Sequence, residues 1–360
     1  MTLFNNDNTE WSTGAGELIL GEAPALFDSI NTRHPELFNL YKHQKSIDWS
    51  EDELSLEQSR LDLLSCPKNI YDIMLLNIAY QWETDSVAAR AIAPLLAPFI
   101  TNSEYWAGIL KISEIEVTHT LTYSEIVRQC VPDPNEVFKL VMHNEKIGAR
   151  LEPVLYYFEQ LRIAGAEYIL GIRKNNQELY NIVYMAICAL YCLERIQFNS
   201  SFAATFAIVE QGWFIAIGQL IQKIMQDEIG IHAAFGRAVL NIMHNTPRGK
   251  IAKQQCSHLI EKLIDDVLAA DAEWNPSLFE NGRSIVGLNP ALLNQYSYYG
   301  SIPVRQTFGL PYTPMENPLK YMDRWLDLNA HQHAQQESSS SNYVLNSVVD
   351  DISDLDKFII

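Results

Sequence analysis

The stretch from Glu116 to Tyr123 carries three chemically active side chains at helical spacing. His119 follows Glu116 by three residues and Tyr123 follows His119 by four, so on an α-helix the carboxylate, the imidazole and the phenol share one face. A carboxylate and a neutral imidazole are ligands for a first-row metal. The phenol, one turn further on, could be oxidised by the reaction of that metal with oxygen. A helical Tyr is most often a core residue, so the value of this trio depends on matching ligands elsewhere.

Asp85 is the first such residue, and it lies inside the mostly apolar stretch 69–96. Burying an unpaired carboxylate costs several kcal/mol, roughly 2–7 even for a neutral polar group. Asp85 therefore needs a partner, a metal or an exposed face. The exposed face, with Arg90 nearby, is the alternative that the sequence leaves open.

Glu194 stands at the end of the apolar run 182–193. A helix that is apolar on all sides is buried on all sides. A surface ion pair with Arg195 fits poorly, because adjacent helical residues do not face one another. Glu228 and His232 supply a second carboxylate–imidazole pair, four residues apart.

Long helices must position these residues, and strand signals are nearly absent. Pro132 ends the helix that carries the opening trio, and residues 1–50 are predicted to form an irregular surface arm. Shorter helices are expected around 291–299 and 318–329. The main predicted helices span 69–96, 103–131, 135–163, 177–206, 213–244 and 250–274.

Four of these helices together carry one ligand set: Asp85, Glu116 with His119, Glu194, and Glu228 with His232. A four-helix bundle with a di-iron or di-manganese site needs one carboxylate from each of two helices and a Glu–His pair from each of the other two. Four carboxylates balance the four positive charges of two divalent ions, which explains how so much charge can be buried. The predicted fold is all-α, a ferritin-like helical bundle with a di-metal carboxylate site.

The charge, the cysteines and the apolar runs of the sequence limit which binding partners and which cellular compartment can be expected. The formal net charge of −18 disfavours nucleic acid and anionic membranes. Five cysteines without a Cys-x-x-Cys pattern suggest neither a disulfide framework nor a thiolate zinc site. The apolar run 182–193 is shorter than the roughly 20 residues that span a bilayer, and the N-terminus lacks the form of a signal peptide. We expect a cytoplasmic protein that binds neither nucleic acid nor membrane.

In combination, these motifs resemble the small (beta) subunit of class I ribonucleotide reductase along nearly the whole chain. The segments that carry the resemblance are Tyr80-Gln-Trp-Glu-Thr-Asp85, Ser113-Glu-Ile-Glu116-x-x-His119-x-x-x-Tyr123, Leu193-Glu194-Arg-Ile-Gln-Phe198, Asp227-Glu228, Val286-Gly-Leu-Asn289 and the acidic tail with Tyr343 and Phe358.

The resemblance implies an oxygen-activated di-iron site that oxidises Tyr123 to a stable radical. The oxidising equivalent stored on this radical would pass to a separate large subunit, where ribonucleotides are reduced. Phe198, Phe202 and Ile224 resemble the apolar pocket that protects the radical. The implied metal ligands are Asp85, Glu116, His119, Glu194, Glu228 and His232.

The resemblance also implies a transfer path and an assembly. Trp49, hydrogen-bonded through Asp227 to His119, would begin the path, and Tyr343 would continue it across the subunit interface. Residues 1–330 would form the helical domain with its arm, and 331–360 a flexible acidic tail that docks on the large subunit through 351–360. A homodimer is expected. Without the resemblance, Trp49 would be an anchor for the arm and Tyr343 a bystander.

One spacing departs from the family pattern, which has two residues between the second Glu and His. Here three residues separate Glu228 from His232, which on a regular helix would swing the imidazole by about 100°. A one-residue π-bulge at Gly230 would absorb the insertion and restore the ligand. Gln226 also stands where many relatives carry an Arg.

Two other functions would use the same set of carboxylates. One is metal storage of the ferritin type, and the other is a di-iron oxygenase that acts directly on its substrate. The phenol one turn past His119 argues against both. The same ligands take iron or manganese; Tyr123 and the resemblance favour iron, with manganese as the alternative.

Overall fold

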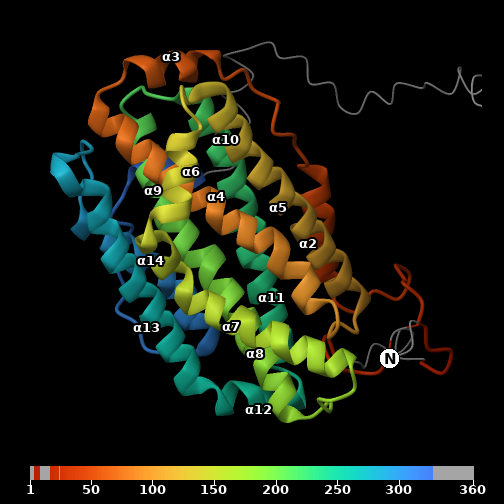
Figure 1. Cartoon of the computed structure of the whole chain (residues 1–360). Helices are drawn as coiled ribbons and strands as arrows, with labels where there is room; N and C mark the ends of the chain where they lie inside the picture. The colour runs from red at the N-terminus through yellow and green to blue at the C-terminus, as the bar shows by residue number, and fades with distance from the viewer. Residues whose placement is uncertain (1–3, 9–16, 24, 327–360) are drawn as a thin grey trace, which may run out of the picture.

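The computed structural model describes residues 4–8, 17–23 and 25–326, and helices dominate them (Figure 1). Within these residues the only extended pairings are two isolated bridges, Ile19 with Ile100 and Ile285 with Leu288. The predicted all-α class is confirmed.

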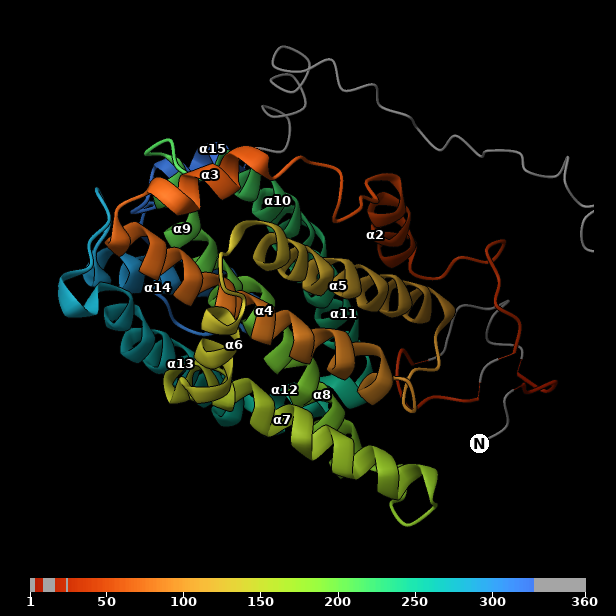
Figure 2. The same cartoon turned by 45° about the horizontal axis from the view of Figure 1, so that its top comes forward.

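Four long helical segments form the centre of the bundle. The helices α4 and α5 lie side by side in Figures 1 and 2, and the two other segments each pass without a break through a short π-helical stretch. The four segments are α4 (Lys68–Leu96), α5 (Ser103–Cys130), α8 (Gln177–Cys192) with η1 (Leu193–Gln197) and α9 (Phe198–Val209), and α10 (Ile215–Met225) with η2 (Gln226–His232) and α11 (Ala233–Met243).

Local capping explains where these helices begin. The Asn102 side chain accepts a hydrogen bond from the backbone N–H of Tyr105, at 2.8 Å, and starts α5. The Asn176 side chain accepts one from the N–H of Leu179, at 2.9 Å, and starts α8. Such caps satisfy N–H groups that have no partner within the helix.

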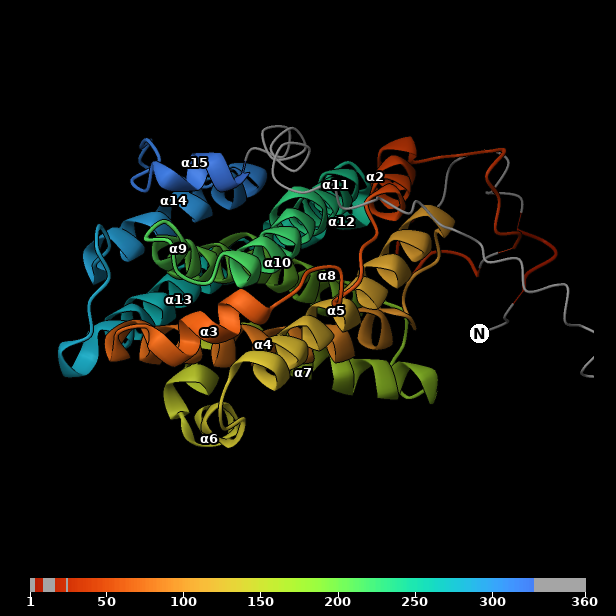
Figure 3. The same ribbon diagram turned by 90° about the horizontal axis from the view of Figure 1, so that it is seen from above.

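The remaining helices surround this centre. Seen from above in Figure 3, α2 flanks α5 and α11, while α13 and α14 lie toward the opposite end. The helix α7 packs against α8 and α13, and α14 packs against α9 and η1. These outer elements are α2 (Pro35–Ser46), α3 (Glu57–Ser65), α6 (Asn135–His143), α7 (Glu145–Ile169), α12 (Pro247–Gln255), α13 (Ser257–Trp274), η3 (Asn275–Gly282), α14 (Pro290–Phe308) and α15 (Tyr321–Leu326).

The structure corrects two predicted helices by dividing them. The helix predicted over 135–163 is α6 and α7, separated at Asn144, whose side chain caps α7 by accepting from the N–H of Lys146. The helix predicted over 250–274 is α12 and α13, separated at Cys256. Asn144 is a good N-cap, and such a residue favours a helix start over a helix interior.

Three further predictions need correction at their boundaries. The arm, predicted to be irregular, contains α2, which starts at Pro35 and packs against α5. The short helix expected around 291–299 extends through Pro303 to Phe308 as α14. The helix expected over 318–329 begins only at Tyr321. The predicted division of the chain at 330 lies outside the described residues.

The helix Gln177–Val209 is long and apolar enough to cross a membrane, but 78% of its most apolar window is buried inside the bundle. Its apolar side chains are therefore accounted for by the core. The run 182–193, predicted to be buried on all sides, is buried except at Ile182 and Leu190, which are partly exposed.

The close packing of α5 against α11 at Gly108 predicts that a larger residue there would lower the free energy of unfolding. A Cβ added at Gly108 would lie 2.1 Å from the ring of Phe235, which is itself buried and packed on Tyr105. Gly108→Ala should lower the free energy of unfolding by about 1–3 kcal/mol, because overpacking shifts buried side chains. Urea denaturation would measure this.

Gly148→Ala is the matched control, since nothing lies within 4 Å of a Cβ at that exposed position in α7. It should be neutral or stabilising by about 0.4–1 kcal/mol. Equal unfolding free energies for the two variants would contradict the close α5–α11 approach.

Candidate metal centre

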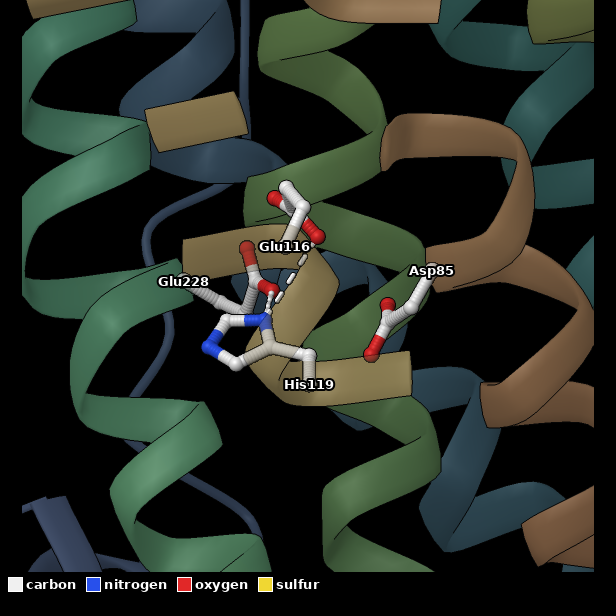
Figure 4. Close-up of side chains that lie close together, drawn as sticks. All are labelled: Asp85, Glu116, His119 and Glu228. Atoms are coloured by element: carbon white, nitrogen blue, oxygen red, sulfur yellow. Dashed lines mark ion pairs between the residues drawn. The ribbon is translucent and has the colours of Figure 1, made fainter. Parts of the chain in front are cut away.

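Two overlapping groups of ligand-type side chains meet in the centre of the bundle. Within each group one ligand atom per residue lies within 4.8 Å of all the others. None of the residues is more than 3% exposed, so the alternative of an exposed Asp85 is wrong. The groups are Asp85, Glu116, His119 and Glu228, and Glu116, Glu194, Glu228 and His232. Figure 4 shows the first group, with its side chains converging from α4, α5 and the helix of Glu228.

Glu116 and Glu228 belong to both groups, and each lies between the two imidazoles. His119 Nδ1 is 2.9 Å from Glu228 Oε1 and 3.5 Å from Glu116 Oε2. His232 Nδ1 is 2.9 Å from Glu228 Oε2 and 3.1 Å from Glu116 Oε1. Each carboxylate thus turns one oxygen toward each imidazole, an arrangement suited to bridging two ions.

The irregularity between Glu228 and His232 is resolved by the π-helical stretch η2. The N–H of Ala233 bonds to the carbonyl of Glu228, a step of five residues. The predicted π-bulge is confirmed, and His232 lies beside Glu228 within the cluster.

A second π-helical stretch, η1, carries Glu194 and was not predicted. The N–H of Phe198 bonds to the carbonyl of Leu193. Glu194 has no partner ligand on its own helix, so no spacing in the sequence could reveal this bulge.

The carboxylates interact strongly through space. Burial, together with the charges of Glu116 and Glu228, raises the pKa of Asp85 well above its usual value. Burial and the charge of Glu228 do the same to the pKa of Glu194. Burial also acts to raise the pKa of Glu228, but its interactions with His232, Glu194 and His119 together outweigh burial, and that pKa lies well below its usual value.

Both imidazoles are held in a strongly anionic environment. Burial acts to lower the pKa of His119, but its hydrogen bond to Asp227 and the neighbouring carboxylates of Glu116 and Glu228 together outweigh burial, and the pKa is raised well above its usual value. For His232 burial also acts to lower the pKa, but the carboxylates of Glu228 and Glu116 together outweigh burial and raise the pKa to about 10.

The donor set fits a pair of metal ions. Both side-chain oxygens of Asp85, Glu116 and Glu194 are buried and lack a hydrogen-bond donor. Unsatisfied buried acceptors are rare in native proteins and call for an explanation such as a bound ion. Carboxylates with one imidazole per position suit iron or manganese rather than closed tetrahedral zinc.

Asp227 connects His119 to the arm. Its Oδ2 accepts a hydrogen bond from Trp49 Nε1 at 2.8 Å and lies 3.1 Å from His119 Nε2. The rings of Trp49 and His119 stack with centroids 5.9 Å apart. Because His119 Nε2 faces a carboxylate, the neutral imidazole keeps its one proton on Nε2, which leaves the lone pair of Nδ1 directed at the cluster. The expected chain of contacts is present, and its part in electron transfer stays a prediction.

Gln44 is a functional-site residue that the sequence analysis missed. Its Nε2 donates to Asp227 Oδ1 at 2.7 Å, which orients the carboxylate between Trp49 and His119. Gln44 lies in α2, inside the segment predicted to be irregular, and no local pattern indicates this contact across the fold.

Tyr123 is fully buried, and its hydroxyl has no hydrogen-bond partner. Burial and the charge of Asp85 raise its pKa well above the usual value. Phe198, Phe202 and Ile224 are buried in the same core, and the two phenylalanine rings stack with centroids 5.9 Å apart. Their shielding role stays a prediction.

Tyr343 and the tail 331–360 lie outside the described residues. Their predicted roles stay predictions.

Comparison with known proteins adds independent findings. Residues 26–311 match the family model described as "Ribonucleotide reductase, small chain". The ribonucleoside-diphosphate reductase subunit beta of Buchnera aphidicola (subspecies Schizaphis graminum) is 28% identical over 330 residues, which cover 87% of each chain.

Solved structures share the fold. The ribonucleotide reductase R2 subunit from Clostridium botulinum aligns with a TM-score of 0.76 at 18% identity, over 91% of this chain and 98% of that one. The dimanganese(II) NrdF of Streptococcus sanguinis aligns with a TM-score of 0.64 at 13% identity, over 83% and 98%. These matches confirm the predicted ferritin-like architecture.

The protonation of the cluster predicts a pH dependence of metal binding. The raised pKa values keep protons on His119 and His232 at neutral pH in the metal-free protein, and burial and the neighbouring charges make Asp85 and Glu194 harder to deprotonate as well. Ligands must lose these protons before an ion binds. Titrating Mn²⁺ into the metal-free protein between about pH 6 and 8 should therefore show tighter binding as the pH rises, with proton release into weak buffer.

His232→Gln serves as the control, because it removes one of the groups that must lose a proton. It should release fewer protons per bound ion. Binding that stays constant over this pH range would contradict the protonation pattern.

Proposed function

Since the chain belongs to the family of ribonucleotide reductase small chains and is a ribonucleoside-diphosphate reductase beta subunit, we propose that its buried site holds two iron ions and generates a stable radical on Tyr123. The observation that supports this most directly is the pair of overlapping ligand groups that share Glu116 and Glu228. As a beta subunit, the protein partners an alpha subunit, in which ribonucleotides are reduced.

In this proposal Asp85 and His119 would hold one ion, Glu194 and His232 would hold the other, and Glu116 and Glu228 belong to both groups and would serve both ions. The two ion positions follow from the two groups of neighbouring ligand atoms. When bound, the metal pair supplies the oxygen-dependent oxidising power for removing one electron from a phenol.

The residues around Tyr123 provide what the radical requires. Oxidation of the phenol removes an electron and leaves a proton to be accepted, and Asp85 is the carboxylate whose charge acts most strongly on Tyr123. Phe198, Phe202 and Ile224 would keep water and reductants away, because their side chains are apolar and fully buried.

The path out of the site begins at Trp49. Asp227 joins Trp49 to His119 through its Oδ2. An electron can therefore move from Trp49 toward the site while the protons in these two hydrogen bonds shift. Tyr343 in the acidic tail continues the path to the large subunit, which the tail 331–360 binds through residues 351–360.

Iron is proposed because Tyr123 is retained beside the ligand set, and manganese is the alternative metal. The Streptococcus sanguinis relative in fold carries manganese by its description, and carboxylate-rich sites accept both metals. We also propose that the subunit forms a homodimer and acts in the cytoplasm.

Electron paramagnetic resonance tests the radical. Protein reconstituted with ferrous iron and oxygen should give a free-radical signal, and Tyr123→Phe should abolish it, because phenylalanine is far harder to oxidise than tyrosine. Tyr180→Phe, which alters another fully buried tyrosine, should leave the signal intact. A signal that persists in Tyr123→Phe, or its absence from the wild type under both iron and manganese loading, would refute the proposal.

Removal of residues 341–360 tests the tail. The truncated protein should form the radical normally yet lose turnover with a large subunit, because the site lies in the described bundle and the docking residues do not. Full-length protein assayed with the same large subunit provides the reference. Loss of the radical signal on truncation, or unchanged turnover, would contradict the assigned role.

A further inference from the structure

A buried ion pair lies within the bundle, apart from the metal ligands. Arg150 Nε donates to Asp271 Oδ1 at 2.7 Å, and both side chains are fully buried. The Arg150 guanidinium also lies over the ring of Tyr80, 3.9 Å from its centre. Burying two charges is unfavourable unless the surrounding hydrogen bonds compensate, so the other contacts of this pair show what it holds.

Those contacts reach the π-helical stretch η1. Arg150 Nη2 donates to the carbonyl of Gln197 at 3.0 Å and to Ser200 Oγ at 2.6 Å. In return Gln197 Nε2 donates to the carbonyl of Arg150 at 2.5 Å. Gln197 is the last residue of η1, so reciprocal hydrogen bonds tie the end of the bulge to α7.

Helix α14 approaches the same stretch from another side. A Cβ added at Gly300 would lie 3.1 Å from the carbonyl oxygen of Arg195, within η1. Ser297, one turn earlier, donates to Asp271 Oδ2 at 2.6 Å, and Ser200 donates to the same oxygen at 2.9 Å. The bulged backbone is therefore enclosed by α7, α13 and α14.

A bulge needs such fixation because it can shift along its helix. Moving it by one residue exchanges one i→i+5 hydrogen bond for another and leaves the backbone nearly as well bonded. A residue that the bulge passes, however, changes its direction by about 100°. Glu194 is the second residue of η1, next to the start of the bulge. A bulge shifted past this residue would turn its carboxylate away from Glu228 and His232.

We propose that the Arg150–Asp271 pair with Gln197 is a positioning cluster that holds the η1 bulge in register and so orients Glu194 toward the second ion position. This inference rests on the proposed assignment of Glu194 as a ligand. The cluster touches no ligand atom; it acts through the backbone of η1, with Gly300 leaving the room that the bulge occupies.

Two variants test the cluster. Gln197→Met removes the reciprocal donor and keeps its volume. Arg150→Met combined with Asp271→Asn removes the whole ion pair without leaving a buried unpaired charge, a change that is often neutral for stability. Amide hydrogen exchange of the metal-free proteins should become faster over residues 193–200 while residues 226–232, in the other bulged helix, keep their protection.

Metal titration supplies the second readout. With Mn²⁺ as the probe, one of the two equivalents should bind about 10- to 100-fold more weakly, the usual effect of losing a residue that orients a ligand, and the other should be unchanged. Gln222→Met is the matched control, because Gln222 is a buried glutamine of α10 that donates to a backbone carbonyl at 3.1 Å. It should leave exchange over residues 193–200 and the binding of both equivalents unaltered.

The outcomes separate this inference from the ligand assignment. Unchanged exchange over residues 193–200 together with two unaltered metal equivalents in Gln197→Met would overturn the positioning role, even if the double variant fails to fold. Weakening of both equivalents alike would also overturn it, since the cluster would then only stabilise the bundle. If Glu194→Ala retains both equivalents, the ligand assignment itself is wrong, whatever the exchange data show.

Discussion

The burial of four carboxylates and two imidazoles at one point of an apolar bundle is the constraint on which the rest of the structure depends. Asp85, Glu116, Glu194 and Glu228 would repel one another in a low-dielectric interior. Burial and this repulsion raise the pKa values of Asp85 and Glu194. The two imidazoles reduce the repulsion in the metal-free state. Two divalent ions would balance the same negative charge. The buried carboxylates therefore need either protons or metal ions to offset their charge.

This constraint explains why both helices that carry the second ion position depart from regular geometry. On a regular α-helix, only side chains three or four residues apart share one face. The cluster needs side chains from four helical segments to converge on one point. The π-helical stretches η1 and η2 place Glu194, Glu228 and His232 within reach of Glu116. In contrast, α4 and α5 are regular around Asp85, Glu116 and His119.

Polar contacts from outside the cluster reach these residues and their helices. Asp227 fixes the His119 ring from the side of the arm, and Gln44 fixes Asp227 in turn. Around η1, the ion pair of Arg150 with Asp271 bonds to Gln197 at the end of the bulge. Each of these hydrogen bonds joins residues that are remote in sequence, so the site and the surrounding bundle form one hydrogen-bonded unit.

The sequence by itself determined the fold class, the long central helices and the grouping of the six candidate ligands, because helical periodicity and residue type are local properties. It also indicated the bulge at Gly230, since the spacing between Glu228 and His232 departs from the family pattern. It failed at helix breaks such as Asn144 and Cys256, at α2, and at the second bulge. Those features, like the contacts of Gln44 and Arg150, were decided only by the tertiary structure, because they depend on hydrogen bonds and packing between segments that are distant in the chain.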